Sequence, residues 1–540
     1  MPHNVGLCNE CRARVPAEFV IRDGQVWIRK DCPQHGSNES LVSSDAQAWQ
    51  AKRELWKYVP SEPEVCTLKC DKCGFDHKAN IVFLDLTNHC NMYCPICIAT
   101  IKGMGFDYNP PISYFEKVFA HISQWDPKPA VQLFGGEPTV RDDMFDIIAL
   151  GRKYGLMMNV TTNGIRLADE EYCKKFCEER IPTRFACDGR HPDIYEKLRH
   201  NRPAYEKKMK ALENLKKYTR VKQTIISCFA WGINDQYLGD LIQYVHDNRD
   251  WISQLLIIPL AETWDPKEFN AAKCNTLEDA ERMVQVAVPE GKVDFIPAGL
   301  SYSMRTVRRF MYNNPRSDML LLAGVHPNCE SMTALVSDGK RYRSVNHYLK
   351  VPFPKAMAEF ASLCDKIAPQ LNKLDPKKFS ERMKAKLLIT RTLLPWGLRT
   401  IKILAVCDYN PPWALMKLLG GQFAHKWRKW FSPKGTILRR KRRVLRVAML
   451  PFEEQHSVDA GRLENCKSVF TYEDTDTGKM NSIPACMWIP YRNGVLKKIS
   501  DKYGVVDSKG RPKAPGTYQS ELQEQASTPA PVAQGTQEKV

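Results

Sequence analysis

The sequence predicts an α/β fold built around a partial (βα)6 barrel, followed by a longer C-terminal region. Between residues 81 and 290, short apolar runs alternate with helical patterns, and this alternation is typical of a parallel sheet. Cysteine-rich and glycine-rich segments directly follow two of these runs, at the strand ends where barrels bind ligands. The predicted strands span 81–86, 130–134, 157–161, 183–186, 221–230 and 255–259. The predicted helices span 142–154, 169–179, 205–217, 235–247 and 277–288.

The chain of 540 residues is long enough for more than one domain. The C-terminal segment turns to Pro, Gly, Ser, Gln and Lys, a composition that predicts disorder. We predict a metal-binding knuckle at 1–60, a second metal motif at 61–80, the barrel at 81–290, a C-terminal region with auxiliary-cluster and basic, amphipathic segments at 291–504, and a disordered tail at 505–540.

Nineteen cysteines favour metal ligation over disulfides, because no charged-then-apolar leader opens the chain and a cytoplasmic location is expected. No apolar run approaches the roughly 20 residues that a membrane span requires. The net charge of +18 predicts an anionic partner, either nucleic acid or a membrane surface.

The central motif is Cys90, Cys94 and Cys97, with C-x3-C-x2-C spacing directly after the apolar run 81–86. Three thiolates bind three irons of a 4Fe–4S cube and leave the fourth iron open to a small chelating ligand. A structural zinc site or a ferredoxin loop is the alternative. A ferredoxin needs a fourth cysteine nearby, and none follows before Cys173.

Gly135, Gly136 and Glu137 end the second predicted strand. The glycines are expected to let the backbone approach a ligand closely. Together with the three cysteines, this segment resembles the radical S-adenosylmethionine (SAM) superfamily. Its members hold SAM on the open iron and cleave it to a 5′-deoxyadenosyl radical. Ile96 departs from the aromatic residue that is usual there.

The resemblance implies that Glu137 is the partner of the SAM amino group. Asn163 ends the third strand, and we interpret it either as a ribose or adenine contact or as part of an ordinary turn. Asp188 follows the fourth strand and is a candidate contact to SAM or substrate.

The N-terminal segment carries two candidate ligand pairs, Cys8 with Cys11 and Cys32 with His35, on either side of a short predicted strand at 25–30. This arrangement predicts a tetrahedral zinc or iron site. Cys32 as a buried bystander and His35 as a structural histidine are the alternatives.

A second C-x3-C-x2-C segment, formed by Cys66, Cys70 and Cys73, precedes His77. Lys72 replaces the apolar residue of the central motif, and no strand leads into this segment. We therefore expect an auxiliary iron–sulfur site, with zinc as the alternative.

Cys329 precedes a predicted hairpin at 332–345, and Cys466 and Cys486 flank a second hairpin turned near residues 477–478. Isolated cysteines at strand edges are what an auxiliary cluster assembled by tertiary folding requires. Cys364 and Cys407 either join such a cluster or are simply buried, and the sequence leaves this open.

Residues 382–452 hold 17 Lys or Arg and one acid, Asp408. Leu and Trp are interleaved with these cations, a composition that favours a membrane interface. A nucleic-acid surface is the alternative, but the many leucines favour lipid. We therefore expect peripheral association with an anionic phospholipid surface. The apolar and aromatic residues are Leu393, Leu394, Trp396, Leu398, Trp413, Leu415, Leu418, Leu419, Phe423, Trp427, Trp430 and Phe431.

Apart from the tail, the chain resembles one radical SAM subgroup, the archaeal tetraether lipid synthases and their bacterial relatives. The resemblance implies auxiliary 4Fe–4S clusters, a mononuclear iron of rubredoxin type, and an electron donor such as ferredoxin or flavodoxin. Asn80 departs from the subgroup, where relatives often carry a further cysteine. The shared features are Cys8 with Cys11, the 32–36 segment, Cys66, Cys70, Cys73, Cys90, Cys94, Cys97, the 326–329 segment, Cys466 and Cys486.

This resemblance implies C–C bond formation between unactivated carbons of lipid hydrocarbon chains. The alternative is methylation of a soluble small molecule such as a pterin, since some relatives have been described that way. A nucleic-acid-binding iron–sulfur protein is a third hypothesis, which the leucines of the basic stretch disfavour.

Overall fold

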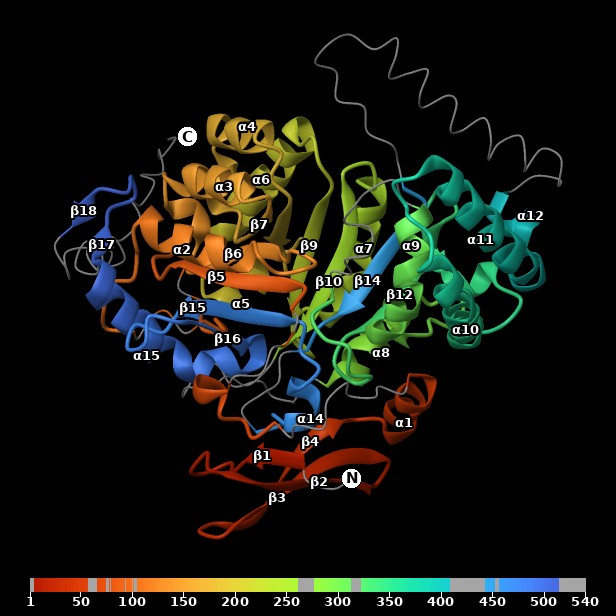
Figure 1. Cartoon of the computed structure of the whole chain (residues 1–540), viewed down its shortest axis with the longest axis horizontal. Helices are drawn as coiled ribbons and strands as arrows, with labels where there is room; N and C mark the ends of the chain where they lie inside the picture. The colour runs from red at the N-terminus through yellow and green to blue at the C-terminus, as the bar shows by residue number, and fades with distance from the viewer. Residues whose placement is uncertain are drawn as a thin grey trace, which may run out of the picture.

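The computed structural model (Figure 1) describes residues 4–56, 66–73, 77, 79–92, 94–99, 101, 104–260, 276–311, 322–407, 442–451 and 456–513. Its first element is a four-stranded antiparallel sheet in the order β1-β2-β3-β4. A short helix, α1, follows, and the Asp45 side chain caps its first turn by accepting a hydrogen bond from Ala48 N. The bounds are β1 (Asn4–Leu7), β2 (Arg14–Arg22), β3 (Gln25–Cys32), β4 (Gly36–Ser43) and α1 (Ala46–Leu55).

The barrel strands form as predicted, and each pairs in parallel with the next. Alternate side chains point outward, as Val82, Leu84 and Leu86 do when they join the main core under the helices. The strands are β5 (Ile81–Thr87), β6 (Ala130–Gly135), β7 (Met157–Thr162), β8 (Thr183–Ala186), β9 (Gln223–Phe229) and β10 (Ile252–Pro259).

Helices cover the outer face of this sheet (Figure 1). The five predicted helices are confirmed, and α2 and α5 are additional. Cys173 and Cys177 are buried in the core from α4. The helices are α2 (Ile112–Ile122), α3 (Met144–Lys153), α4 (Glu170–Glu178), α5 (Pro192–Arg199), α6 (Ala204–Tyr218), α7 (Leu238–Asp247) and α8 (Leu277–Ala287). Short 3-10 turns are η1 (Cys70–Lys72), η2 (Pro138–Val140), η3 (Ile165–Ala168), η4 (Asp235–Tyr237), η5 (Ala298–Met304) and η6 (Val345–Tyr348).

The C-terminal region extends both edges of the barrel sheet. β14 runs parallel to β10, and β15 runs parallel to β5. The sheet order is β11-β12-β14-β10-β9-β8-β7-β6-β5-β15-β16, with β13 paired to β12, so both predicted hairpins are part of it. The strands are β11 (Ile296–Pro297), β12 (Ser331–Ser337), β13 (Tyr342–Ser344), β14 (Val444–Met449), β15 (Ser468–Glu473) and β16 (Met480–Pro484).

A second group of helices gathers beside β12 and β14 (Figure 1). Helices α9, α10 and α11 share a small core of their own, in which Cys364 is buried. The helices of the C-terminal region are α9 (Arg305–Met311), α10 (Phe353–Leu371), α11 (Phe379–Thr400), α12 (Ile403–Cys407), α14 (Ala460–Leu463) and α15 (Ala485–Tyr503). Within the described residues, no helix is long and apolar enough to cross a bilayer.

The first residues of the expected disordered tail are folded. β17 (Val505–Val506) pairs with β18 (Pro512–Lys513). Both valines are buried, and Val506 N donates to Asn109 O at 2.9 Å. This correction has a simple cause: two adjacent valines bury apolar surface inside a polar segment. Residues 514–540 lie outside the described part of the chain.

Candidate active site and metal centres

The cysteine loop after β5 lies at the carboxyl ends of the barrel strands. Cys90 is buried, while Cys94 and Cys97 are half-buried. Cys97 N donates to Cys94 O at 3.1 Å, which closes a tight turn, and Ile96 packs into an apolar cluster beside Cys94. Burial raises the pKa of the Cys90 and Cys94 thiols. A thiol that binds a metal ion is deprotonated. Cys90 and Cys94 would therefore be thiolates once a cluster is bound, although burial alone favours their protonated forms.

Gly135 and Gly136 let the end of β6 pack against the cysteine loop. A Cβ atom on Gly136 would lie 2.0 Å from His89 O, and one on Gly135 would lie 2.4 Å from Thr87 O. A backbone hydrogen bond also holds the two segments together, because Gly136 N donates to Thr87 O at 2.7 Å. We expected these glycines to make room for a ligand, but what they approach is the backbone of the chain itself.

Glu137 links the ends of β6 and β7 from a fully buried position. Its Oε1 accepts hydrogen bonds from Thr139 N, Thr139 Oγ1 and Thr162 Oγ1 at 3.0, 2.6 and 2.8 Å. Its Oε2 accepts one from Asn163 N at 2.6 Å. Burial raises the pKa of this carboxyl, although the four donors oppose the shift. Oε2 retains a lone pair for a further donor.

Asn163 reaches the cysteine loop directly. Its Nδ2 donates to Asn91 Oδ1 at 2.7 Å and lies 3.8 Å from Cys90 Sγ. The structure thus brings Glu137, Asn163 and Cys90 close together.

Asp188 is committed to the protein itself. Its carboxylate accepts hydrogen bonds from Arg199 Nε and Nη2 at 2.8 and 3.0 Å, and from Cys228 N at 2.9 Å. Burial raises its pKa, but Arg199, Lys208 and the Cys228 N–H together lower it by more. Asp188 therefore positions Arg199, whose positive charge in turn stabilises the Cys94 thiolate.

Arg199 and Lys208 are functional candidates that sequence reasoning missed. Lys208 is buried and donates to Asn163 O and Ala186 O at 2.6 and 2.7 Å. Both cations lower the pKa of Cys94, in opposition to burial. The signal that could have identified Lys208 is its position on the apolar face of a predicted helix. A single lysine does not change the helical periodicity, so it was overlooked.

The N-terminal ligand pairs converge as expected. The ligand atoms of Cys8, Cys11, Cys32 and His35 all lie within 4.8 Å of one another, and no other such group of three or more occurs among the described residues. Cys11 Sγ and Cys32 Sγ are 3.8 Å apart, and Cys32 Sγ is 3.6 Å from His35 Nδ1. Zn–S bonds of about 2.3 Å in a tetrahedron place two sulfurs about 3.8 Å apart.

The donors around this site also favour a metal. The backbone N–H of Gln34 lowers the pKa of Cys32 to about 6, with further help from His35. Cys32 is thus poised as a thiolate. Three sulfurs and one imidazole at tetrahedral spacing fit a single zinc or iron ion.

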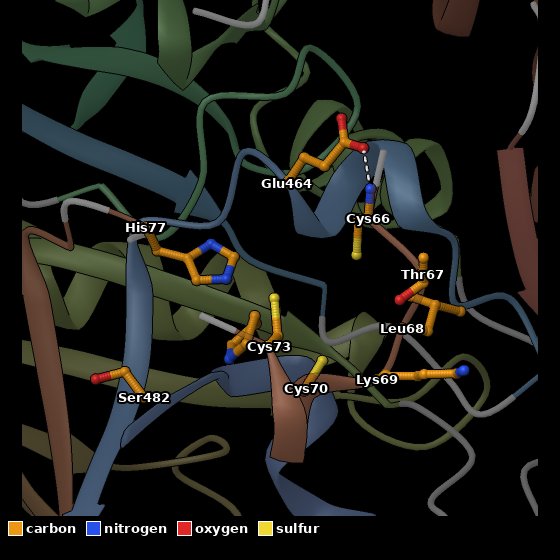
Figure 2. A pocket seen from close by; sticks show the side chains of 10 residues that line it. Cys66, Thr67, Leu68, Lys69, Cys70, Cys73, His77, Glu464 and Ser482 are labelled. Carbon is orange, nitrogen blue, oxygen red and sulfur yellow. Dashed lines mark hydrogen bonds between the residues drawn. The ribbon is translucent and has the colours of Figure 1, made fainter. Parts of the chain in front are cut away.

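The second cysteine segment surrounds a small cavity of about 60 Å³. Figure 2 shows the sulfurs of Cys66, Cys70 and Cys73 and the imidazole of His77 turned toward this cavity. Glu464 closes one side, where its Oε1 accepts a hydrogen bond from Cys66 N at 2.7 Å. The ligand atoms of these four residues do not all lie within 4.8 Å of one another. Their spacing is therefore wider than that of the N-terminal site, where four ligands surround the place of one ion.

The remaining auxiliary candidates fall into two places. Cys466 pairs with Gly324 in an isolated β-bridge, and a Cβ at Gly324 would lie 2.5 Å from Cys329 Sγ. Cys329 and Cys466 therefore flank the same short segment. Cys486 opens α15, two residues after Pro484, which lines the cavity of the second cysteine segment.

Two family models match this chain. Residues 84–245 match the Radical SAM superfamily, and residues 4–44 match the HMPTM N-terminal zinc ribbon domain. The second match covers β1 to β4 and all four ligands of the tetrahedral site.

Similar proteins cover only part of the chain. The 7,8-dihydro-6-hydroxymethylpterin dimethyltransferase of Methanocaldococcus jannaschii is 29% identical over 48% of this chain and 53% of its own length. The Fe-coproporphyrin III synthase of Methanosarcina barkeri is 27% identical over 25% of this chain and 34% of its own length. The chain thus spans about half and about a third of these curated relatives.

Among solved structures, SuiB of Streptococcus suis bound to S-adenosylmethionine aligns with 52% of this chain and 69% of its own, at 13% identity and a TM-score of 0.31. The family models, rather than this similarity, carry the assignment. The matched ranges enclose the three cysteines after β5 and the N-terminal ligand set. Residues 84–245 are therefore a radical SAM domain, and an N-terminal zinc ribbon domain precedes it.

Proposed function

We propose that this protein is a radical SAM enzyme that forms C–C bonds at unactivated carbons. Cys90, Cys94 and Cys97 would hold a 4Fe–4S cluster with SAM bound to its open iron. Given one electron from a donor such as ferredoxin or flavodoxin, the bound group would supply reductive cleavage of SAM to methionine and a 5′-deoxyadenosyl radical, which takes a hydrogen atom from a C–H bond and leaves as 5′-deoxyadenosine. The observation that supports this proposal is the loop geometry. Glu137 and Asn163 hold the strand ends of β6 and β7 against Cys90.

The chain's own residues prepare this site. Cys90, Met92, Ala99 and Ile101 form an apolar cluster against which Cys94 and Cys97 pack. The half-buried Arg199 and the buried Lys208 place two positive charges near Cys94. The free lone pair of Glu137 Oε2 is where the SAM amino group is expected to donate.

The catalytic proposal is tested by a Cys94→Ala variant, reconstituted anaerobically with iron and sulfide. We expect no 5′-deoxyadenosine from this variant with SAM and dithionite. The matched control is Cys364→Ala, because Cys364 is buried in the separate core that α9, α10 and α11 share. Full production of 5′-deoxyadenosine by Cys94→Ala would overturn the assignment.

We also propose at least one auxiliary 4Fe–4S cluster. Cys66, Cys70, Cys73 and His77 share a cavity that fits the ligand arrangement of such a cluster. Cys486 is an alternative fourth ligand, while Cys329 and Cys466 offer thiolates to a separate site. Analysis that finds only four irons per chain would contradict this proposal.

The substrate proposal is a lipid hydrocarbon chain, reached from a membrane surface. Support comes from α11, which exposes an apolar stripe at helical spacing. Phe379, Met383, Leu387, Leu394 and Leu398 are 70, 47, 72, 55 and 52% exposed. They recur every three or four residues once Thr390 is included, so they lie on one face.

Cations flank this stripe, which we name the α11 stripe. Lys384, Lys386, Arg391 and Arg399 are exposed around it, and Glu381 is the only acid of the helix. Such a helix lies in the plane of a membrane interface, and each cation near an anionic leaflet contributes about 1 kcal/mol.

Part of the predicted basic stretch has another location. Trp396 is half-buried against Phe360, with ring centroids 4.8 Å apart, and Leu393 packs on the α9–α11 core. These two residues do not belong to the exposed face. Trp413, Leu415, Leu418, Leu419, Phe423, Trp427, Trp430 and Phe431 lie outside the described residues.

Co-sedimentation with vesicles of anionic phospholipid tests the docking surface. We expect Leu387→Glu to weaken binding about tenfold, because a charge replaces apolar area that enters the interface. Val286→Glu on α8 is the matched control, since Val286 is 71% exposed but outside the stripe.

Lipid mass spectrometry of cells with and without the gene tests the reaction. The expected result is loss of a cross-linked, long-chain lipid from the cells that lack the gene. Absence of vesicle binding together with an unchanged lipid profile would overturn the lipid proposal.

A second candidate is methylation of a soluble small molecule. The observation that favours it is the similarity to a pterin dimethyltransferase. Incubation of the reconstituted enzyme with labelled SAM and a reduced pterin separates the candidates. Label transferred to the pterin supports methylation rather than lipid coupling.

A further inference from the structure

A row of polar side chains crosses the interior of the barrel. The strand register aligns Thr161 of β7 with Arg184 of β8, and Arg184 with Thr224 of β9. Thr224 is in turn aligned with Gln254 of β10, which is aligned with Arg446 of β14. Neighbouring members of this row are about 4.8 Å apart across the strands. We call these five residues the lumen row.

The lumen row faces the inside of the barrel. Successive residues of a strand point to opposite faces, and the neighbour Phe185 packs outward in the main core, where Lys208 of α6 lies 5.7 Å from its ring. Likewise Ile225, Leu255 and Leu445 belong to the outward core. The members of the lumen row are half-buried, so they border open space rather than packed core.

Three adjacent members of the row lack partners. Within the part of the chain that the structure describes, the side chains of Arg184, Thr224 and Gln254 make no hydrogen bond or close ion pair. Burial lowers the pKa of Arg184 to about 10, while Glu330 raises it and Arg446 lowers it. A guanidinium held inside a protein without a partner is costly.

The charge of this region is positive. Arg446 Nη2 donates to Glu330 Oε1 at 2.9 Å, and Glu330 Oε2 accepts from Ala323 N at 2.7 Å. Glu330 thus forms an ion pair with Arg446 and also attracts Arg184 from a longer distance, so one carboxylate faces two guanidinium groups. Arg446 Nε is buried without a hydrogen-bond partner.

The lumen row is separate from the radical site. Asp188, beside the cysteine loop, follows Arg184 by four residues, which is roughly 13 Å along an extended chain. An apolar belt lies between the two levels, aligned across four strands: Ala186, Ile226, Leu256 and Ala448.

We propose that Arg184, Thr224 and Gln254 form a phosphate-binding site that holds a phosphate group of the substrate inside the barrel. A guanidinium fork, a hydroxyl and an amide side by side offer donors to several oxygens of one tetrahedral anion. The apolar belt then holds the part of the substrate nearest the reacting carbon. The site goes beyond the proposed function, because it requires neither a lipid nor a methyl transfer.

The test is isothermal titration of the anaerobically reconstituted enzyme with inorganic phosphate and with glycerol 1-phosphate. We expect the wild type to bind phosphate saturably. Arg184→Gln should weaken this binding about tenfold or more, because it removes one bidentate charged contact. The matched control is Arg220→Gln, at an exposed arginine, which should bind as the wild type does. Thr224→Val is a second variant, which removes a hydroxyl donor without changing the charge of the site and should also weaken phosphate binding.

Tighter binding of glycerol 1-phosphate than of inorganic phosphate would assign the site to a phospholipid headgroup. Equal binding would assign it to a phosphate group irrespective of what bears it, and both outcomes support the site. Absence of saturable binding by the wild type would overturn it. Binding unchanged in Arg184→Gln and Thr224→Val would overturn it as well. The readout uses no turnover and no vesicles, so it is independent of the lipid and methylation tests.

Discussion

Arg492 on α15 donates hydrogen bonds from Nη2 and Nε to Asp85 Oδ1 on β5, at 2.6 and 3.0 Å. Both side chains are almost fully buried, and Trp488 Nε1 donates to the other oxygen of Asp85 at 2.7 Å. Arg492 also donates to Ala99 O at 2.7 Å, two residues after Cys97. The C-terminal helix therefore holds the first barrel strand and the cluster loop together.

We predict that Arg492→Leu destabilises the protein by about 3–5 kcal/mol, because it leaves the Asp85 carboxylate buried without its cation. The thermal unfolding midpoint and the iron retained after reconstitution should both fall. Arg152→Leu is the control, since its pair with Glu179 is exposed and is expected to contribute about 0–1 kcal/mol. An unchanged midpoint in Arg492→Leu would contradict the role of this contact.

Gly136→Ala should weaken both folding and cluster binding, because the added Cβ meets the His89 carbonyl and the loop must move. Overpacking of this kind costs about 1–3 kcal/mol. Gly494→Ala on α15 is the opposite case. Nothing lies within 4 Å of its Cβ, so alanine should stabilise that helix by about 0.5–1 kcal/mol. Unfolding midpoints of the two variants that shift in the same direction would refute this contrast.

The zinc ribbon should lose its single ion in Cys32→Ser. We expect one metal fewer per chain by elemental analysis, with the iron of the other sites retained, since the four ligands lie at the spacing of one tetrahedral ion. Cys364→Ala should keep every metal. Loss of iron–sulfur absorption in Cys32→Ser would show that the ribbon cysteines contribute to a cluster instead.

His326 should make stability fall with acidification. Its side chain is buried near Arg53 and Arg462, and burial, followed by these two charges, holds its pKa well below the usual range. Below the unfolded-state pKa of about 6.5 the unfolded chain takes up a proton that the folded chain refuses. Stability is then lost by up to about 1.4 kcal/mol for each further pH unit.

Unfolding midpoints of wild type and His326→Gln between pH 7 and pH 5 measure this effect. Glutamine can still accept the hydrogen bond that Asn328 N donates to His326 Nδ1 at 3.2 Å. The variant should show the shallower pH dependence. Parallel curves would assign the acid sensitivity to other groups.

The sequence predicted the barrel strands because their outward residues alternate or run together as Val, Leu and Ile, as in 81–86. It also predicted the tetrahedral site, since ligand pairs around a hairpin have few other uses. It could not predict that β14 and β15 join the barrel edges, because strand pairing across hundreds of residues leaves no local pattern. The same limit hid the contact between Asp85 and Arg492.

Single polar residues were the other blind spot. Arg184 occupies a strand of four residues, where period-two alternation is too short to separate a lumen side chain from an exposed one. Gly136 was recognised as a residue that permits close approach, but the partner of that approach depends on the neighbouring strand. Phe379 lies outside the basic stretch that was predicted from charge, although it begins the exposed stripe.

The pairing of β14 with β10 and of β15 with β5 also governs how the molecule is made on the ribosome. When residue 259 has emerged, both borders of the nascent sheet are open, and the strands that cover them begin only at residues 444 and 468. At a synthesis rate of about 5–20 residues per second, roughly 10–40 s pass between the emergence of residue 259 and that of β14. Bare strand borders recruit other strands. The nascent chain is therefore most prone to self-association in the interval when its cluster cysteines are already synthesised and Arg492 is not.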